Sequence, residues 1–232
     1  MTQVTFHPKL LEIVDSLEKR DMISFNQAYT EFMATKQTLL LPNIMPTIEK
    51  NYMGITGLYF IKDFLSVDQI NNIKHILDTD IDFEPLNKAN SKSRKIAHYG
   101  YYYSYDRSGL KPATAIPKNI LEYVKYKYIN NLAGSNLLDK DFDQLIINKY
   151  KPGEQIAPHI DLPSQFGAVI ACLSIGQEVD INFSLGLLNK NVKVTEGSLY
   201  IMSGDARYKW KHALRNKGMA DRYSLTFRSV IL

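Results

Sequence analysis

The sequence predicts an α+β protein whose C-terminal half is a β-barrel or a β-sandwich. Three observations predict this class. The segments with helical spacing of apolar residues lie before residue 143, short apolar stretches follow one another after it, and turn pairs such as Pro152-Gly153 separate these stretches. Hydrophobic residues make up 45% of the 232 positions and charged residues 22%, so the chain has the composition of a folded protein and not of a disordered one.

The composition also excludes several classes of protein. No apolar run reaches the roughly 18 residues that a membrane span needs, and the first eight residues lack the features of a signal peptide. Cys172 is the single cysteine, so an internal disulfide and a cysteine-based zinc site are excluded. We therefore expect a monomer in the cytoplasm or nucleus, with no membrane association. The net charge of +4 mildly favours a polyanionic partner.

Residues 1–53 predict a helical N-terminal extension ahead of a main domain at 54–232. Apolar residues recur at helical spacing in two segments, and Ser24 with Gln27 forms the capping-box pattern that starts the second. Two prolines, the later of them Pro46, then end the helical pattern. The apolar stripe is typical of a helix that packs on a core, although a stripe of this kind also suits a partner helix.

The main domain is predicted to begin with a strand at 57–61 and a helix that Ser66 caps. Gln69, three residues after Ser66, completes a capping box. A third helix is predicted to begin at Pro117 and to run to Tyr128. Six short strands follow, each an apolar stretch bounded by turn residues: 144–150, 168–175, 179–183, 192–194, 198–202 and 223–230.

Tyrosines cluster just before the third predicted helix. Tyr99, Tyr101 and Tyr103 alternate along the chain, and Arg94 and Lys95 precede them. Basic residues interleaved with aromatic residues suit a lid on which an unpaired base stacks. The same alternation would also suit tyrosines that simply pack one face of a sheet, so both interpretations stay open.

His159 and Asp161 form a candidate metal site. They are two residues apart, and this spacing puts both side chains on one face of an extended segment. With the distant His212 as a third ligand they would form a 2-His-1-carboxylate facial triad, which leaves three positions of the metal open. The pattern is weak by itself, and the alternative is that these are unrelated polar residues.

Two arginines near the C-terminus favour an anionic ligand. Arg222 and Arg228 are six residues apart, so on a strand they share one face with Ser224 and Thr226. Buried guanidinium groups are costly without anionic partners. Oxygenases that depend on iron(II) and 2-oxoglutarate provide such a partner, because the keto acid chelates the metal and a guanidinium holds its far carboxylate. Structural ion pairs are the alternative.

Taken together, these residues resemble the AlkB dioxygenases. The matching segments are 148–153 (NKYKPG), 159–161 (HID), His212 and 222–228 (RYSLTFR), in the order and with the approximate spacing of the family. The resemblance covers residues 57–232. It implies a double-stranded β-helix (jelly-roll) core with flanking helices, Fe(II) as the metal and 2-oxoglutarate as the cosubstrate.

The resemblance also implies a role for each matching residue. The residues implied to bind Fe(II), and so to be catalytic, are His159, Asp161 and His212. Those implied to bind 2-oxoglutarate are Asn148, Tyr150, Arg222, Ser224 and Arg228. Those implied to contact the substrate are Arg94, Tyr99, Tyr101 and Arg207. Within this set, Arg222 is expected on the far carboxylate of the keto acid, with Arg228 nearer the metal.

Within the family, residues 158–166 and 173–176 resemble the branch that hydroxylates a modified wobble uridine of tRNA. Pro163 stands where bacterial repair members carry an acidic residue that acts on an alkylated base. We therefore expect a dioxygenase that uses O2 to hydroxylate or demethylate a modified base in single-stranded nucleic acid, RNA or tRNA more than DNA. The alternatives are a protein-directed oxygenase or demethylase with the same site, and a barrel that binds without turnover.

Overall fold

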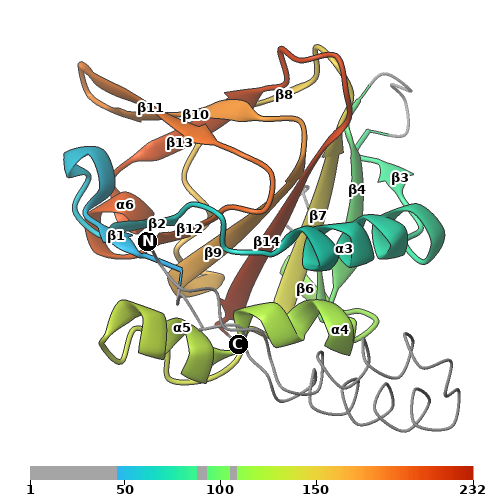
Figure 1. Ribbon diagram of the computed structural model, residues 1–232, viewed down its shortest axis with the longest axis horizontal. Helices are drawn as coiled ribbons and strands as arrows, with labels where there is room; N and C mark the ends of the chain where they lie inside the picture. Colours follow the sequence, from blue (N-terminus) through green and yellow to red (C-terminus); the bar gives the residue numbers. More distant parts are fainter. Residues whose placement is uncertain (1–45, 88–92, 105–108, 232) are drawn as a thin grey trace, which may run out of the picture. The chain divides into compact units, whose positions relative to one another are not determined.

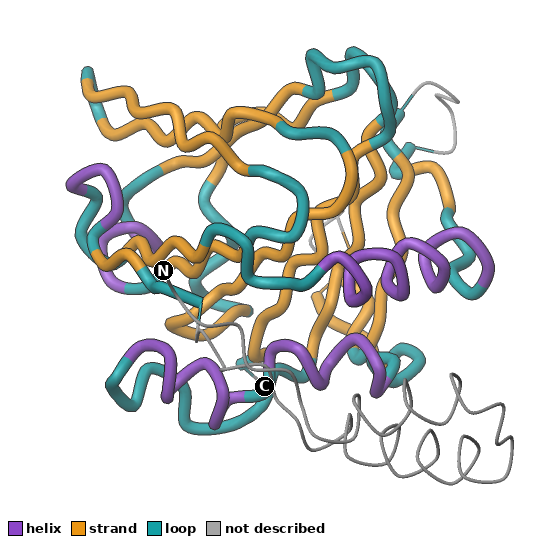
Figure 2. Tube along the Cα trace, viewed as in Figure 1, coloured by secondary structure: helices purple, strands orange, loops and turns teal. Residues whose placement is uncertain are grey.

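The computed structural model describes residues 46–87, 93–104 and 109–231, and two β-sheets dominate this region (Figures 1 and 2). The larger sheet has eight strands in the spatial order β1 (Glu49–Lys50), β2 (Leu58–Ile61), β12 (Leu199–Met202), β9 (Phe166–Gly176), β14 (Arg222–Val230), β7 (Gln144–Tyr150), β4 (Lys95–Tyr99) and β3 (Glu84–Pro85). The smaller sheet has four strands in the order β11 (Leu188–Val194), β10 (Val179–Leu185), β13 (Lys211–Arg215) and β8 (Gln155–His159). A separate hairpin joins β5 (Tyr101–Ser104) to β6 (Gly109–Pro112).

The two sheets face each other and enclose the candidate site, as the predicted jelly roll requires. All six strands predicted after residue 143 are present, as β7, β9, β10, β11, β12 and β14. The predicted helical extension lies at 1–45 outside the described residues, apart from its last part. There, β1 pairs with β2, so the larger sheet includes residues that the predicted boundary at 53 assigned to the extension.

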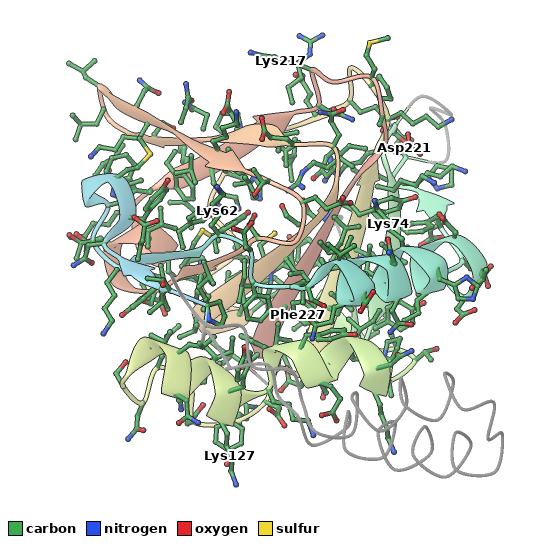
Figure 3. All side chains as sticks on the ribbon, viewed as in Figure 1. Lys62, Lys74, Lys127, Lys217, Asp221 and Phe227 are labelled. Atoms are coloured by element: carbon green, nitrogen blue, oxygen red, sulfur yellow. The ribbon has the colours of Figure 1, made fainter. Side chains whose placement is uncertain are left out.

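Alternation along β14 separates two cores. Tyr223, Leu225 and Phe227 point to the core between the larger sheet and the helices, where Figure 3 labels Phe227. The helices of this layer are α3 (Val67–Thr79), α4 (Lys118–Leu121) and α5 (Tyr126–Ala133), and they contribute buried side chains such as Ile73 and Ile120. The opposite face of β14 points between the two sheets, into a second core. Burial of each large apolar side chain contributes about 1.5 to 3 kcal/mol, so both faces of the larger sheet are strongly determined.

The helix α3 begins as the sequence predicts. The Ser66 hydroxyl accepts from the Gln69 backbone N–H at 3.3 Å, and the Gln69 side chain accepts from the Ser66 N–H at 2.8 Å. Because Ser66→Ala removes one half of this box, we expect a loss of about 1 kcal/mol in the free energy of unfolding and of about 2 to 4 °C in Tm. Denaturant and thermal unfolding followed by circular dichroism would check this, and an unchanged stability would contradict it.

The third predicted helix is wrong as a single element. The structure has α4, then a 3-10 turn at Glu122–Val124, then α5, because Lys125 is extended (φ −56°, ψ 139°). The backbone N–H of Tyr126 donates to a carboxylate oxygen of Asp141 at 2.8 Å, which caps a new helix from a distant part of the chain. In the part of the chain that the structure describes, no helix has the length and apolar character that crossing a membrane requires.

Candidate active site

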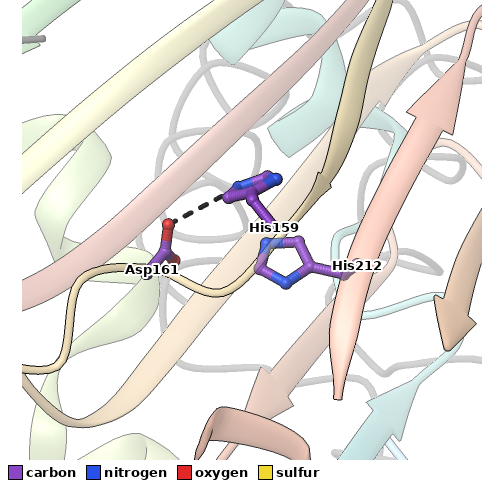
Figure 4. A group of neighbouring side chains, drawn as sticks. All are labelled: His159, Asp161 and His212. Atoms are coloured by element: carbon purple, nitrogen blue, oxygen red, sulfur yellow. Dashed lines mark ion pairs between the residues drawn. The ribbon is translucent and has the colours of Figure 1, made fainter. Parts of the chain in front are cut away.

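Three metal-binding side chains converge at the edge of the smaller sheet (Figure 4). His159 ends β8, Asp161 follows it by two residues, and His212 lies on the neighbouring strand β13. The β8–β13 register pairs His159 with His212, and their ring centroids are 4.3 Å apart. One ligand atom from each of the three residues lies within 4.8 Å of the other two. The three residues predicted to bind one metal ion are therefore together.

The protonation states of this triad suit a divalent cation. The Nδ1 atom of His159 lies 2.8 Å from the carbonyl oxygen of Ala157, and Nε2 lies 3.6 Å from a carboxylate oxygen of Asp161. Burial lowers the pKa of His212 to about 3, so its imidazole is neutral at pH 7. Burial opposes the ionisation of Asp161, but the Arg228 guanidinium and the two imidazoles outweigh it and hold the carboxyl pKa well below its usual range. The result is a neutral nitrogen donor at His212 and an anionic oxygen donor at Asp161.

The hydrogen bonding around the triad leaves a buried ligand nitrogen available for a metal. The Nδ1 atom of His212 is buried and has no hydrogen-bond partner among the described residues. Two imidazoles and a single carboxylate are the donor set of non-haem iron(II) sites, and they occupy three of six coordination positions. The triad therefore fits Fe(II) and leaves three positions for other ligands.

Arg228 binds the carboxylate of Asp161, the acidic member of the triad. Its Nη2 donates to one oxygen of Asp161 at 3.2 Å and its Nε to the other at 3.3 Å, which is a two-point contact. Its Nη1 donates to the side-chain oxygen of Gln144 at 3.1 Å, and its guanidinium lies over the ring of Phe166. The side chain that was predicted to bind 2-oxoglutarate thus makes its main contacts with the metal ligand, where it can orient the carboxylate.

Arg222 is a buried cation that lacks an anionic partner. It is 0% exposed, and the only hydrogen bond of its side chain in the described structure goes from Nη2 to the hydroxyl of Ser224 at 3.3 Å. Its Nε and Nη1 have no hydrogen-bond partner among the described residues, and burial lowers its pKa. Because an unpaired buried charge costs several kcal/mol, this position fits a carboxylate that is supplied by a ligand. The fit is that of the far carboxylate of 2-oxoglutarate.

A small cavity of about 40 Å³ lies between the triad and the strands β7 and β14, and both histidines of the triad line it. Arg222 is not among its lining residues, but its hydrogen-bond partner Ser224 is. The other predicted cosubstrate-binding residues also line it: Asn148, Tyr150, Ser224 and Arg228. The β14–β7 register explains this meeting, since it places Ser224 opposite Asn148 and Arg222 opposite Tyr150 on one face. The triad histidines and most of the residues predicted to bind the keto acid therefore border one continuous space.

A larger cleft of about 600 Å³ opens on the outer side of the triad. The residues that shape it are His159, Asp161, Arg228 and the following: Arg94, Tyr103, Ile146, Asn148, Ile156, Ala157, Ile160, Leu162 and Phe166. Arg94 was predicted to contact the substrate, and it lies in this lining. Its Nε donates to the side-chain oxygen of Asn148 at 3.0 Å, which holds the guanidinium at the boundary between the cleft and the small cavity.

Both tyrosines that were predicted to contact the substrate are placed elsewhere. Tyr99 lies opposite Leu145 and packs on the helix-facing core, and burial raises its pKa. The side chain of Tyr101 is not among those that line the cleft. The alternation fails because Gly100 (φ 74°) interrupts it between β4 and β5, where a side chain would collide with the carbonyl of Asp143. The basic and aromatic residues at 88–92 and 105–108 lie outside the described residues.

The fourth predicted substrate residue, Arg207, has a structural role. It is 2% exposed, and its guanidinium donates to the carbonyl oxygens of Asp161, Phe166 and Gly167 at 2.7, 3.0 and 3.1 Å. These bonds close the loop between the metal ligand and β9. A guanidinium that is enclosed in this way does not face a substrate, so the prediction for Arg207 is wrong.

Sequence reasoning left Tyr103 open between a base-stacking lid and sheet packing, and it missed the amide that supports the site. Tyr103 lines the cleft and packs on Phe166, with ring centroids 5.6 Å apart. Gln144 is 0% exposed and contacts Arg228. A signal for Gln144 existed, since it lies four residues before Asn148 on a strand that is otherwise apolar, and so on the same face. The strands β8 and β13 were also missed, because their polar residues hide the alternation.

Comparisons with known proteins agree with this geometry. Residues 57–228 match the model of the 2OG-Fe(II) oxygenase superfamily. The tRNA (carboxymethyluridine(34)-5-O)-methyltransferase alkbh8 of Xenopus tropicalis is 32% identical over 68% of this chain, and an uncharacterised mimivirus protein, L905, is 30% identical over 78% of this chain and 89% of its own length. The structure of OsALKBH1 superposes with a TM-score of 0.58 at 18% identity, over 75% of this chain and 96% of that one.

These matches confirm the predicted fold and the predicted resemblance to AlkB proteins. The aligned region spans about a quarter of the length of the Xenopus tropicalis relative, 25%. The region that matches the family model, 57–228, carries the triad and the two arginines.

Proposed function

Because this chain belongs to the 2OG-Fe(II) oxygenase superfamily, whose members use Fe(II) and 2-oxoglutarate, we propose that it is an AlkB-type dioxygenase that oxidises a modified base in single-stranded nucleic acid, RNA in preference to DNA. One observation carries the proposal. Both histidines of a 2-His-1-carboxylate triad line one small cavity, and so does Ser224, which is the hydrogen-bond partner of a buried guanidinium, that of Arg222, with two nitrogens unpaired among the described residues. Few ligands other than a metal-chelating dicarboxylate would complete the triad and pair with the guanidinium at once.

In this proposal each side chain has a definite task. When bound, Fe(II) and 2-oxoglutarate supply the activation of O2 and the oxidation of a substrate C–H bond. His159, Asp161 and His212 hold the metal from one side. Arg228 fixes the orientation of the Asp161 carboxylate, and Arg222 with Ser224 anchors the far end of the keto acid. The apolar walls of the cleft exclude water from the reacting carbon.

The cleft suits a flat base. Its walls are largely apolar, and Tyr103 and Phe166 provide aromatic surfaces beside the triad. Enzymes that act on a base take it out of the stack and hold it between such side chains. The only carboxylate in the described lining is Asp161, which Arg228 already neutralises, while Arg94 adds a cation. This charge pattern favours a neutral or anionic base over a cationic alkylated one.

The name of one relative supports RNA over DNA. The name of the Xenopus tropicalis protein assigns it to modification of carboxymethyluridine at position 34 of tRNA. A uridine with an acidic or polar substituent would match a cleft with Arg94 at its inner boundary. We therefore propose a modified uridine of RNA as the first substrate to test.

A basic groove at the end of β7 would serve the nucleic-acid backbone. It has a volume of about 480 Å³, and its lining includes Lys95, Lys149 and Lys151. Lys95 and Lys149 are register partners on β4 and β7, and they lie on the face of the sheet opposite that of the cleft residue Asn148. Lys149 pairs with Asp221 at 3.2 Å, whereas Lys95 and Lys151 are exposed to solvent.

We expect the double variant Lys95→Ala/Lys151→Ala to bind single-stranded RNA about tenfold more weakly at low salt, and to reduce the slope of log K against log salt by about 1.4, since two phosphate contacts are lost. Fluorescence anisotropy with a labelled oligonucleotide measures both. The matched control is Lys62→Ala/Lys127→Ala, which removes the same charge from two exposed positions labelled in Figure 3. An equal loss in both double variants would contradict a specific groove.

The proposed reaction is tested by 2-oxoglutarate-dependent succinate formation with a panel of substrates. We expect stimulation by modified uridines in single-stranded RNA, and mass spectrometry should find the product with one oxygen added or a methyl group removed. Stimulation by protein or peptide substrates instead, without competition by RNA, would replace the proposal with a protein-directed oxygenase. An iron-loaded protein that forms no succinate with any member of the panel would indicate a binding module.

A further inference from the structure

Gln144 is a buried polar residue that none of the proposed catalytic steps uses. It begins β7, is 0% exposed, and lies directly opposite Arg228 in the β14–β7 register. Its neighbours on the helix-facing side of the strand, Leu145 and Ile147, are core residues of the kind that a buried strand normally carries. A polar side chain in such a position needs hydrogen-bond partners, because an unsatisfied buried amide costs about 1 to 3 kcal/mol.

Both ends of the Gln144 amide have partners. Its oxygen accepts from Nη1 of Arg228 at 3.1 Å, and its nitrogen lies 3.4 Å from the backbone carbonyl oxygen of Tyr101 on β5. These two contacts require opposite ends of the amide, so they fix which end faces the arginine. The amide is therefore held in one orientation, with its acceptor toward the guanidinium.

The guanidinium of Arg228 is enclosed on three sides as a result. Asp161 takes its Nε and Nη2, Gln144 takes its Nη1, and the ring of Phe166 covers one face with its centroid 4.8 Å from the central carbon. Arg228 is 6% exposed, so water does not readily replace any of these partners. If the Gln144 contact were lost, Nη1 would be left unpaired, and only Asp161 and Phe166 would hold the guanidinium in place.

We propose that Gln144 is a positioning residue of the metal centre: it acts through Arg228 to hold the carboxylate of Asp161 in the orientation that binds the metal. The inference rests on the proposed metal site. It also connects that site to the wall of the cleft, since the same amide contacts Tyr101 and the same guanidinium packs on Phe166, which in turn contacts Tyr103.

The test is a double-mutant cycle on metal affinity. The Kd for Mn(II) is measured by calorimetry on the full chain in the absence of O2. We expect Gln144→Leu to raise the Kd for Mn(II) about tenfold, the lower end of the effect of removing a residue behind a metal ligand. In the Arg228→Met background the same change should raise the Kd by less than about twofold, because Gln144 then has nothing to position. The Mn(II) electron paramagnetic resonance spectrum should change in Gln144→Leu for the same reason.

A stability control separates positioning from packing. Ile73→Val removes a buried methyl group from the helix-facing core, and it should lower Tm while leaving the Kd for Mn(II) unchanged. If Arg228→Met does not fold, the Mn(II) electron paramagnetic resonance spectra of Gln144→Leu and Ile73→Val are compared. A change in the first and not in the second indicates positioning rather than packing. A Kd and spectrum for Gln144→Leu that match the wild type would overturn the inference, as would an equal effect in both backgrounds. A wild-type protein that binds no Mn(II) would instead count against the proposed metal site itself.

Discussion

Asp161→Asn is expected to lower the affinity for Fe(II) or Mn(II) by more than about 100-fold and to abolish 2-oxoglutarate turnover. Loss of a residue behind a metal ligand already costs 10- to 100-fold in affinity, and this change removes the one anionic ligand of the triad. The amide keeps the size of the side chain and still offers an oxygen to Arg228, so the fold should survive. Calorimetric metal titration together with succinate formation measures the effect.

A matched control separates the site from the general loss of one negative charge. Asp180→Asn makes the same chemical change on an exposed residue of β10, and it should leave both metal affinity and turnover at wild-type values. Turnover in Asp161→Asn within tenfold of the wild type would show that Asp161 is not a metal ligand.

Arg222→Met is expected to raise the KM for 2-oxoglutarate about 100-fold while leaving metal affinity unchanged. The keto acid would lose the only buried cation near its far carboxylate, and loss of one partner of a buried charge pair typically costs 2 to 5 kcal/mol. The protein without ligand should be as stable as the wild type or more stable, because an unpaired buried guanidinium is replaced by an apolar chain. Steady-state kinetics and thermal unfolding test the two halves of this prediction.

A raised KM without a loss of stability distinguishes a ligand-binding arginine from a structural one. A structural arginine would lower stability when replaced, and a general electrostatic effect would appear equally in Arg215→Met, which removes an exposed guanidinium from β13. An unchanged KM in Arg222→Met, or a loss of stability of several kcal/mol without ligand, would contradict the assignment of Arg222 to the keto acid.

The parts of the site that follow from strand geometry could be predicted from the sequence. The two-residue spacing of His159 and Asp161, and the even spacing of Arg222 and Arg228, fix which side chains share a face once the segments are extended. The capping box at Ser66 is similarly local, and the structure contains it. These features depend on a few neighbouring residues and not on how distant segments meet.

The parts that failed depend on distant segments. Whether the Arg207 guanidinium faces a substrate or backbone carbonyls depends on where the loop at 161–167 lies, which the sequence around Arg207 does not reveal. The alternation of the tyrosines stops at Gly100 because the chain passes close to Asp143 there. Likewise, the break before α5 depends on Asp141, fifteen residues beyond Tyr126.

We propose that one metal ion and one molecule of 2-oxoglutarate bind together where His159, His212 and Ser224 meet. Anaerobic addition of Fe(II) and then 2-oxoglutarate, followed by visible absorption, tests this most directly. We expect a metal-to-ligand charge-transfer band that needs both additions, saturates at one equivalent of iron and is absent in His159→Ala. A wild-type protein without the band, or a band that persists in His159→Ala, would contradict it.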